Sequence, residues 1–120
     1  MDDRYARGLA KLAEVTGPTG EGVVAPLGDL GRYVVEFAFG DIYSRDGLGL
    51  REREIVTTTA LVALGGREKQ LQSHLRAGLH LGVTARELEE VIIQTVPYAG
   101  FPTAINALET LREVTAATEP

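Results

Sequence analysis

The side chains of this chain that are best suited to chemistry are Glu54 and the two histidines, His74 and His80. Imidazole changes its charge near neutral pH, and a carboxylate beside it can set its orientation and basicity. His74 lies one helical turn from Leu71 and from Gly78, which places it on an apolar side of its predicted helix. If the helices that carry Glu54 and His74 are antiparallel neighbours, the two side chains can form an acid/base pair.

Each of these residues also has a purely structural interpretation. His74 is equally compatible with a hydrogen-bonded core group, and His80 with a cation that favours a helix C-terminus. The segment 51–54 resembles the solvated first turn of a helix. Glu54, however, shares a helix face with Thr58 and Leu61, which favours an inward orientation.

Metal and cofactor sites are not predicted. Two histidines six residues apart do not share a helix face, and no third ligand accompanies them. The chain has no cysteine, which removes disulfides, thiolate metal sites and thiol nucleophiles. The glycine-rich segments do not match a phosphate-binding loop.

Composition restricts the partners. Twelve Lys and Arg against seventeen Asp and Glu give a net charge of −5, without a basic run, which argues against nucleic acid or an anionic membrane as partner. The apolar runs are far shorter than the roughly 20 residues that span a bilayer. The segment 1–4 does not resemble the start of a secretion signal. We therefore expect a cytoplasmic protein.

Periodicity and glycine or proline stops predict an all-α fold of about six helices in a single domain, residues 1–120. No segment alternates with the period of a strand. Two loops are expected, at 16–26 and at 45–49. The predicted helices span 3–15, about 27–43, 50–64, 67–81, 85 to about 98, and 102 to about 117.

Two of these helices carry more specific expectations. In the second, glycines at positions 28, 31 and 40 are expected to weaken the helix. The fifth opens with Thr84 and Glu87 at the spacing of a capping box. The apolar stripe expected on the buried side of the second helix consists of Leu30, Val34, Phe37, Ala38 and Ile42.

Five segments, in order, resemble the carboxymuconolactone decarboxylase family of the alkylhydroperoxidase D-like superfamily. The opening RYARG at 4–8 also resembles the start of the decarboxylases. The five segments are GDIYSR at 40–45, LREREIV at 50–56, SHLRAG at 73–78, GVTAREL at 82–88 and YAGFPTAINA at 98–107.

The resemblance implies an all-α protomer that assembles into a trimer or hexamer. It also implies a choice between two activities. Peroxidase members carry two cysteines three residues apart ahead of the helical histidine. Here the equivalent positions hold Arg67 and Gln70. Neither can act as a redox nucleophile, so we expect no thiol peroxidase activity.

The remaining implied activity is the cofactor-free decarboxylation of γ-carboxymuconolactone in aromatic compound catabolism, on the β-ketoadipate pathway. In this interpretation His74 is the acid/base residue and Glu54 orients and tunes it. The substrate is a small carboxylated molecule. The candidate substrate-binding residues are Tyr43, Arg45, Arg51, Arg53, His80 and Tyr98.

The chain differs from the decarboxylases in the loop after the first helix and at Asp41, Tyr43 and His80. These differences leave two alternatives open. One is another cofactor-free acid/base reaction, such as a dehydration or cyclisation in a biosynthetic pathway. The other is a non-catalytic oligomer that binds a small acid. A homo-oligomer is further suggested by the apolar stripe 91–99 and the small residues of 104–107.

Overall fold

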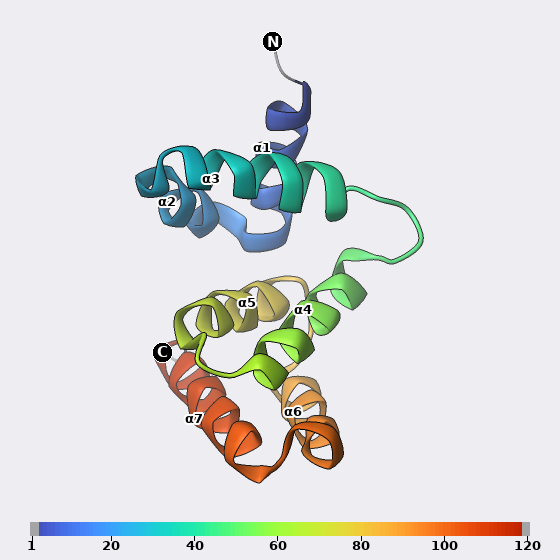
Figure 1. Cartoon of the computed structure of the whole chain (residues 1–120), viewed down its shortest axis with the longest axis vertical. Coiled ribbons are helices and arrows are strands. Elements are labelled where there is room, and N and C mark those ends of the chain that lie inside the picture. The colour runs from blue at the N-terminus through green and yellow to red at the C-terminus, as the bar shows by residue number, and fades with distance from the viewer. Residues whose placement is uncertain (1–2, 119–120) are drawn as a thin grey trace. The chain divides into compact units, whose positions relative to one another are not determined.

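The computed structural model describes residues 3–118, and within them every regular element is helical (Figure 1). No strand occurs in this range, which confirms the all-α prediction. The elements are α1 (Asp3–Thr16), the 3₁₀ turn η1 (Gly17–Thr19), α2 (Gly20–Val24), the 3₁₀ turn η2 (Ala25–Leu27), α3 (Asp29–Tyr33), the π-helix η3 (Val34–Ile42), α4 (Leu50–Leu64), α5 (Glu68–His80), α6 (Ala85–Ala99) and α7 (Phe101–Thr118).

The chain divides into two compact units between Leu50 and Arg51. Each unit has its own buried side chains, and the single domain expected over 1–120 stays a prediction. Among the described helices, none has both the length and the apolar character needed to cross a bilayer.

The first unit is built on a close approach between α1 and η3, which lie against each other in Figure 1. A Cβ added at Gly8 would lie 2.1 Å from the carbonyl oxygen of Val35, and one at Gly40 would lie 2.7 Å from that of Arg4. No side chain fits at such distances. Leu12 is among the buried side chains of this unit. The two glycines therefore set the distance between the two backbones.

An ion-pair cluster joins the same two helices at one end. The guanidinium of Arg4 donates to both carboxylate oxygens of Asp41, with nitrogen to oxygen distances of 2.7 to 3.0 Å. Arg7 donates to Asp41 at 3.3 Å and to the carbonyl oxygen of Gly40 at 2.7 Å. The hydrogen bond from Arg4 is the main cause that holds the pKa of the Asp41 carboxyl below its usual value.

The loop predicted at 16–26 is wrong, because η1, α2 and η2 fill this stretch with short helical turns. Pro18 and Pro26 stand in the first turns, where a missing N–H group leaves no hydrogen bond unmade. Gly20 is buried, and a Cβ there would lie 2.1 Å from the hydroxyl oxygen of Thr16. Glycine serves here for close packing and not for a loop conformation.

The apolar stripe predicted for 27–43 is also wrong. Leu30, Phe37 and Ile42 are exposed, and the buried side of this segment carries other residues. The amide of Tyr43 donates to the carbonyl oxygen of Ala38 five residues earlier, at 2.8 Å. That wider winding changes which residues share a face, so a period of 3.6 residues selects the wrong side.

The glycines expected to weaken this segment have other roles. Gly28 has φ +61° and separates η2 from α3, so it lies outside the helix interior. A Cβ at Gly31 would lie 2.1 Å from the carbonyl oxygen of Val24. Gly31 and Gly40 are therefore contact positions between backbones.

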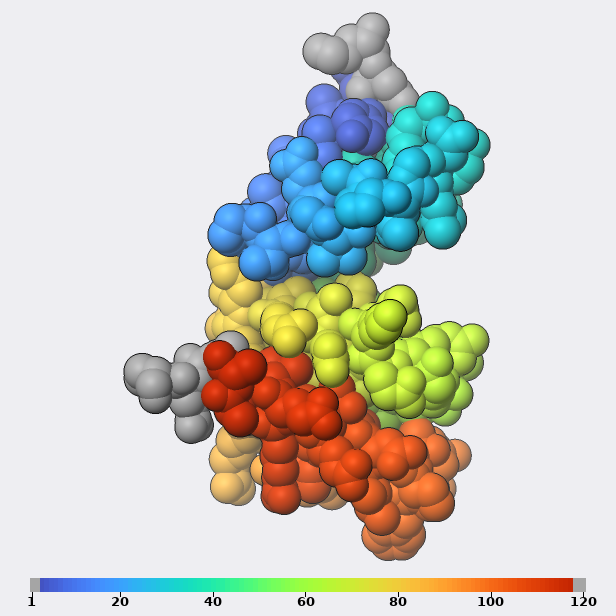
Figure 2. All heavy atoms as spheres, turned by 90° about the vertical axis from the view of Figure 1, so that its left-hand side faces the viewer, coloured from blue at the N-terminus to red at the C-terminus, as the bar shows by residue number. Residues whose placement is uncertain are grey.

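The second unit consists of α4 to α7 around one apolar core. Figure 2 shows α7, in red and orange, beside α5, in yellow-green, and α7 also packs against α6. α4 contributes Val62 to this core. The buried members of the core are Val62, Leu71, Leu75, Val83, Leu88, Ile92, Ala104, Ala107, Leu111 and Val114.

Local signals set the helix ends of this unit as predicted. α4 has the predicted bounds, and Gly65 and Gly66 follow it with φ +65° and +69°. The capping box is confirmed, since the Glu87 amide donates to the Thr84 hydroxyl at 3.0 Å and the Thr84 amide donates to the Glu87 carboxylate at 2.9 Å. The predicted limits of α5, α6 and α7 agree with the structure to within about one residue.

We expect Gly8→Ala to destabilise the protein by about 1–3 kcal/mol, because the added methyl group must push α1 away from η3. Gly22→Ala is the matched control. Its added Cβ meets nothing within 4 Å, and alanine favours the helix. Urea unfolding followed by circular dichroism measures both. Equal stability of the two variants would show that the spacing of α1 and η3 is not set by Gly8.

Candidate active site

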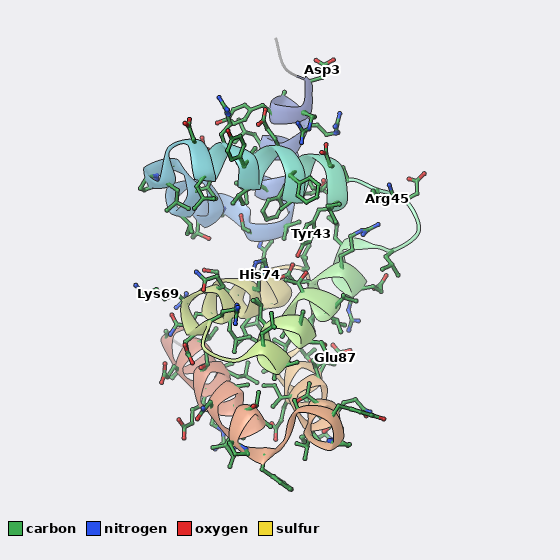
Figure 3. All side chains as sticks on the ribbon, in the orientation of Figure 1. Asp3, Tyr43, Arg45, Lys69, His74 and Glu87 are labelled. Atoms are coloured by element: carbon green, nitrogen blue, oxygen red, sulfur yellow. The ribbon has the colours of Figure 1, made fainter. Side chains whose placement is uncertain are left out.

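Glu54 and His74 form the central pair of the candidate site. The Glu54 carboxylate lies 2.5 Å from Nδ1 of His74, across the gap between α4 and α5. Glu54 is 1% exposed, whereas the His74 side chain retains 23% of its accessible surface. Figure 3 labels His74 on α5. The structure thus brings together the two residues that the sequence proposed as an acid/base pair.

The helix faces explain this placement. Glu54, Thr58 and Val62 recur at intervals of four residues on the buried side of α4. His74 borders the buried stripe of α5, which includes Leu75. The short connection at Gly65 and Gly66 folds α5 back beside α4. A buried position for Glu54 therefore follows from the pattern of its own helix.

The contact defines one proton arrangement when Glu54 is ionised. An ionised carboxylate can only accept a hydrogen bond, and Nδ1 of His74 is then the donor. In the neutral ring, Nε2 then holds a lone pair, and in the charged ring Nε2 carries an acidic proton. Glu54 consequently leaves Nε2 as the nitrogen that exchanges protons with a bound molecule.

Side chains from two other helices meet around Gly78 of α5. A Cβ at Gly78 would lie 3.8 Å from Cγ of Glu54 and 3.7 Å from a methyl carbon of Leu88. Gly78 is one turn after His74, and Leu88 of α6 is fully buried. The start of α6 is therefore in the immediate surroundings of the Glu54 side chain.

Arg51, one of the predicted substrate-binding residues, forms an ion pair with Glu87. Its guanidinium donates to one carboxylate oxygen of Glu87, while the other oxygen accepts the amide of Thr84. The Thr84 amide, followed by Arg51, holds the pKa of the Glu87 carboxyl below its usual value. Sequence reasoning identified Glu87 as a cap and missed its link to α4, since helix-capping patterns carry no information on contacts between helices.

The other predicted binding residues lie in several environments. Arg53 is half-buried beside Glu54 on α4. Tyr43 is buried in the first unit, where its ring stacks on Phe39 with centroids 4.9 Å apart. Arg45 is exposed in the segment between η3 and α4. Tyr43 and Arg45 are described with the first unit, so their roles at the pair stay predictions.

His80 and Tyr98 are both exposed. His80 is the last residue of α5, as its structural interpretation required. Tyr98 is 85% exposed and lines an open groove of about 560 Å³ together with Glu87 and Glu90. The residues that line this groove include neither Glu54 nor His74. The structure does not bring Tyr98 to the pair.

Among the described residues, no cluster of three or more His, Asp or Glu side chains could hold a metal ion. The pair itself consists of an imidazole and a buried carboxylate. These two groups can move a proton.

The sequence pattern of the carboxymuconolactone decarboxylase family matches residues 28–113. This span contains Glu54, His74 and the start of α6. The chain belongs to this family. Membership in the carboxymuconolactone decarboxylase family confirms the resemblance proposed from the five sequence segments.

Three relatives show how far the similarity extends. The chain is 37% identical over 118 residues to 4-carboxymuconolactone decarboxylase of Acinetobacter baylyi, covering 94% of this chain and 87% of that protein. It is 34% identical over 82 residues to an uncharacterized 15.0 kDa protein of Paracoccus denitrificans, covering 68% and 61%. It is 29% identical over 77 residues to nitrosuccinic acid decarboxylase of Metarhizium robertsii, covering 62% and 52%.

We expect neutral His74 to be protonated at Nδ1, because Glu54 can only accept. Long-range ¹⁵N–¹H correlation spectra of histidine-labelled protein distinguish the two ring tautomers, and exposed His80 is an internal reference in the same sample. Glu54→Leu removes the acceptor and should move the proton to Nε2. A His74 spectrum that does not change in Glu54→Leu would contradict the pairing.

Proposed function

We propose that this chain is a cofactor-free decarboxylase that acts on a small carboxylated lactone or a related acid. The observation that carries the proposal is the 2.5 Å contact between buried Glu54 and His74. Family membership supports the same reaction class, because two of the relatives are named as decarboxylases.

The named substrates share one electronic property. In carboxymuconolactone, the electron pair left by departing CO₂ can delocalise through the ring double bond to the lactone carbonyl oxygen. In nitrosuccinic acid, a nitro group next to the departing carboxylate can accept the pair as a nitronate. Each substrate carries its own electron sink, so the protein need not supply one. We propose an acid with a carboxylate beside such a group as the substrate class.

His74 and Glu54 then have distinct roles. The bond between carbon and the departing carboxylate breaks, CO₂ leaves, and the electron pair moves onto the enolate or nitronate oxygen. Nε2 of protonated His74 stabilises that oxygen or delivers its proton to carbon, and solvent returns a proton to the ring. Glu54 holds the ring in place and stabilises its charged form through Nδ1.

Arginine is suited to hold the carboxylate that does not leave. Bidentate binding by a guanidinium fixes the orientation of a carboxylate as well as its position. Arg53 is the nearest such group in sequence to Glu54, and its half-buried position limits competition from water. We propose Arg53 as the principal anchor. Arg45, Tyr43 and His80 stay as further candidates for substrate contacts.

We expect His74→Ala to reduce kcat by at least about a hundredfold on the best substrate, which is the usual effect of losing an acid/base group. Release of CO₂ from carboxymuconolactone and from nitrosuccinic acid, without added cofactor, measures the activity. Lys69→Gln, an exposed change on the same helix, is the control and should leave kcat unchanged. Normal turnover by His74→Ala would remove this ring from the mechanism.

Two outcomes would favour the alternatives. Stabilisation against heat by a small acid, without any CO₂ release, would favour a non-catalytic binding protein. Conversion of an acid without loss of carbon would favour another acid/base reaction, such as dehydration or cyclisation. Both experiments use the same purified chain, so one preparation decides among the three functions.

We also propose that the chain forms a homo-oligomer, with a trimer or hexamer as the expected size. The small residues of 104–107 do not support an interface, because Ala104 and Ala107 are buried in the core of their own unit. Other side chains now support the proposal. Tyr98, Phe101 and Ile105 are 85%, 69% and 53% exposed around the junction of α6 and α7. Large apolar side chains gathered on a surface are typical of protein interfaces.

Sedimentation velocity at micromolar concentration is expected to show a species larger than the monomer. Phe101→Glu should shift that species towards the monomer, because a charge would then have to be buried in the interface. The control is Glu113→Gln, an exposed change on the same helix, which should leave the size unchanged. A wild-type protein that sediments as a monomer would contradict the proposal.

A further inference from the structure

We propose that Arg51 and Glu87 are positioning residues, whose ion pair fixes the first turn of α4 against the start of α6 and so holds Glu54 in register with His74. The inference deepens the proposed function and, for its catalytic consequence, rests on it. It also assigns Arg51 a role different from the substrate binding that the sequence predicted.

The first turn of α4 needs such an attachment. Arg51 is the second residue of the helix and follows a stretch, 43–49, without regular structure. The first four backbone N–H groups of a helix have no partner within it, and helix ends open more easily than helix centres. Glu54 is the fifth residue of α4, only three positions after Arg51. Opening of this turn would therefore displace the Glu54 carboxylate.

Glu87 is already oriented before it binds Arg51. Its first carboxylate oxygen accepts the Thr84 amide at 2.9 Å, and its own amide donates to the Thr84 hydroxyl at 3.0 Å. The second oxygen is then directed to the Arg51 guanidinium. Arg51 and Glu87 are 40% and 45% exposed, and exposed ion pairs contribute little stability by themselves. Loss of the pair is therefore expected to change the local position of the first turn of α4 and to change the overall stability little.

A second feature places the same turn of α6 close to Glu54. Leu88 follows Glu87 and is fully buried, with its methyl carbons against Gly78. Cγ of Glu54 lies 3.8 Å from the same Cβ position, so Leu88 and Glu54 both face this side of Gly78. The start of α6 is thus attached to the first turn of α4 through Arg51, and its Leu88 lies with Glu54 around Gly78.

Small displacements at this pair matter for catalysis. A misplacement of about 1 Å at a catalytic group can reduce a rate roughly a hundredfold. Glu54 touches the reacting system only through His74, so a shift of the first turn of α4 alters the ring orientation and the Nδ1 hydrogen bond together. Loss of the ion pair should therefore appear in kcat rather than in KM.

The experiment compares Arg51→Gln, Glu87→Gln and the double variant. Glu87→Gln keeps an amide oxygen that can accept from Thr84, so the cap of α6 is retained while the charge that holds Arg51 is lost. Glu90→Gln is the matched control, because it removes an exposed charge three residues after Glu87 on the same helix. Circular dichroism establishes that each variant is folded.

We expect each single variant to reduce kcat about tenfold, with KM changed less than twofold. The double variant should be no worse than either single variant, because both remove one contact. The Nδ1 proton resonance of His74 should shift in all three variants and not in Glu90→Gln. This resonance is readable without any substrate, so it tests the positioning even if neither acid is turned over.

Two results would overturn the inference. If Arg51→Gln raises KM while Glu87→Gln leaves kcat and the His74 resonance unchanged, Arg51 binds substrate as the sequence predicted. If kcat and the resonance match those of the wild type in all three variants, the ion pair does not position the site. Absence of turnover in the wild type, with the resonance shifted in the variants, would contradict the proposed function and leave the positioning role standing.

Discussion

The burial of one carboxylate, that of Glu54, governs the second unit. A charged group removed from water is stable only where hydrogen bonds and nearby positive charge replace its hydration. The imidazole of His74 supplies one of these hydrogen bonds from the adjacent helix. This bond requires His74 to lie at the level of Glu54 along the two helices. The short connection between α4 and α5 and the packing of α6 near Gly78 place the ring in this position. A fold that tolerates Glu54 in this position has, by the same contacts, an oriented histidine.

The second unit was largely predictable because its boundaries are encoded locally. Glycines end α4 and α5, a capping box starts α6, and each signal involves residues a few positions apart. The pairing of Glu54 with His74 was a hypothesis from helix faces that required the two helices to be neighbours, and the structure brings the two side chains together. The link from Arg51 to Glu87 was not predictable in this way, because it joins residues 36 positions apart on surfaces that look solvated in sequence.

The first unit was predicted less well, and the reason is its dependence on contacts between helices. Glycine and proline normally mark loops, but Gly20 and Gly31 are required here by backbones that approach too closely for any side chain. Only the position of the neighbouring helix distinguishes these two uses of glycine. Leu30 and Phe37 are exposed because the side that carries Val35 and Gly40 packs against α1 instead.

The π-helical winding of η3 affects how its residues are aligned with those of related proteins. The i to i+5 hydrogen bond of a π-helix encloses one residue more than the i to i+4 bond of an α-helix. Relatives with ordinary winding between positions 34 and 42 would then be shorter there by one residue. A sequence alignment without a gap in this segment would match Asp41 and Tyr43 to the wrong residues of those relatives. Substitutions inferred at these two positions are therefore sensitive to where that gap is placed, whereas those at Glu54 and His74, inside regular helices, are not.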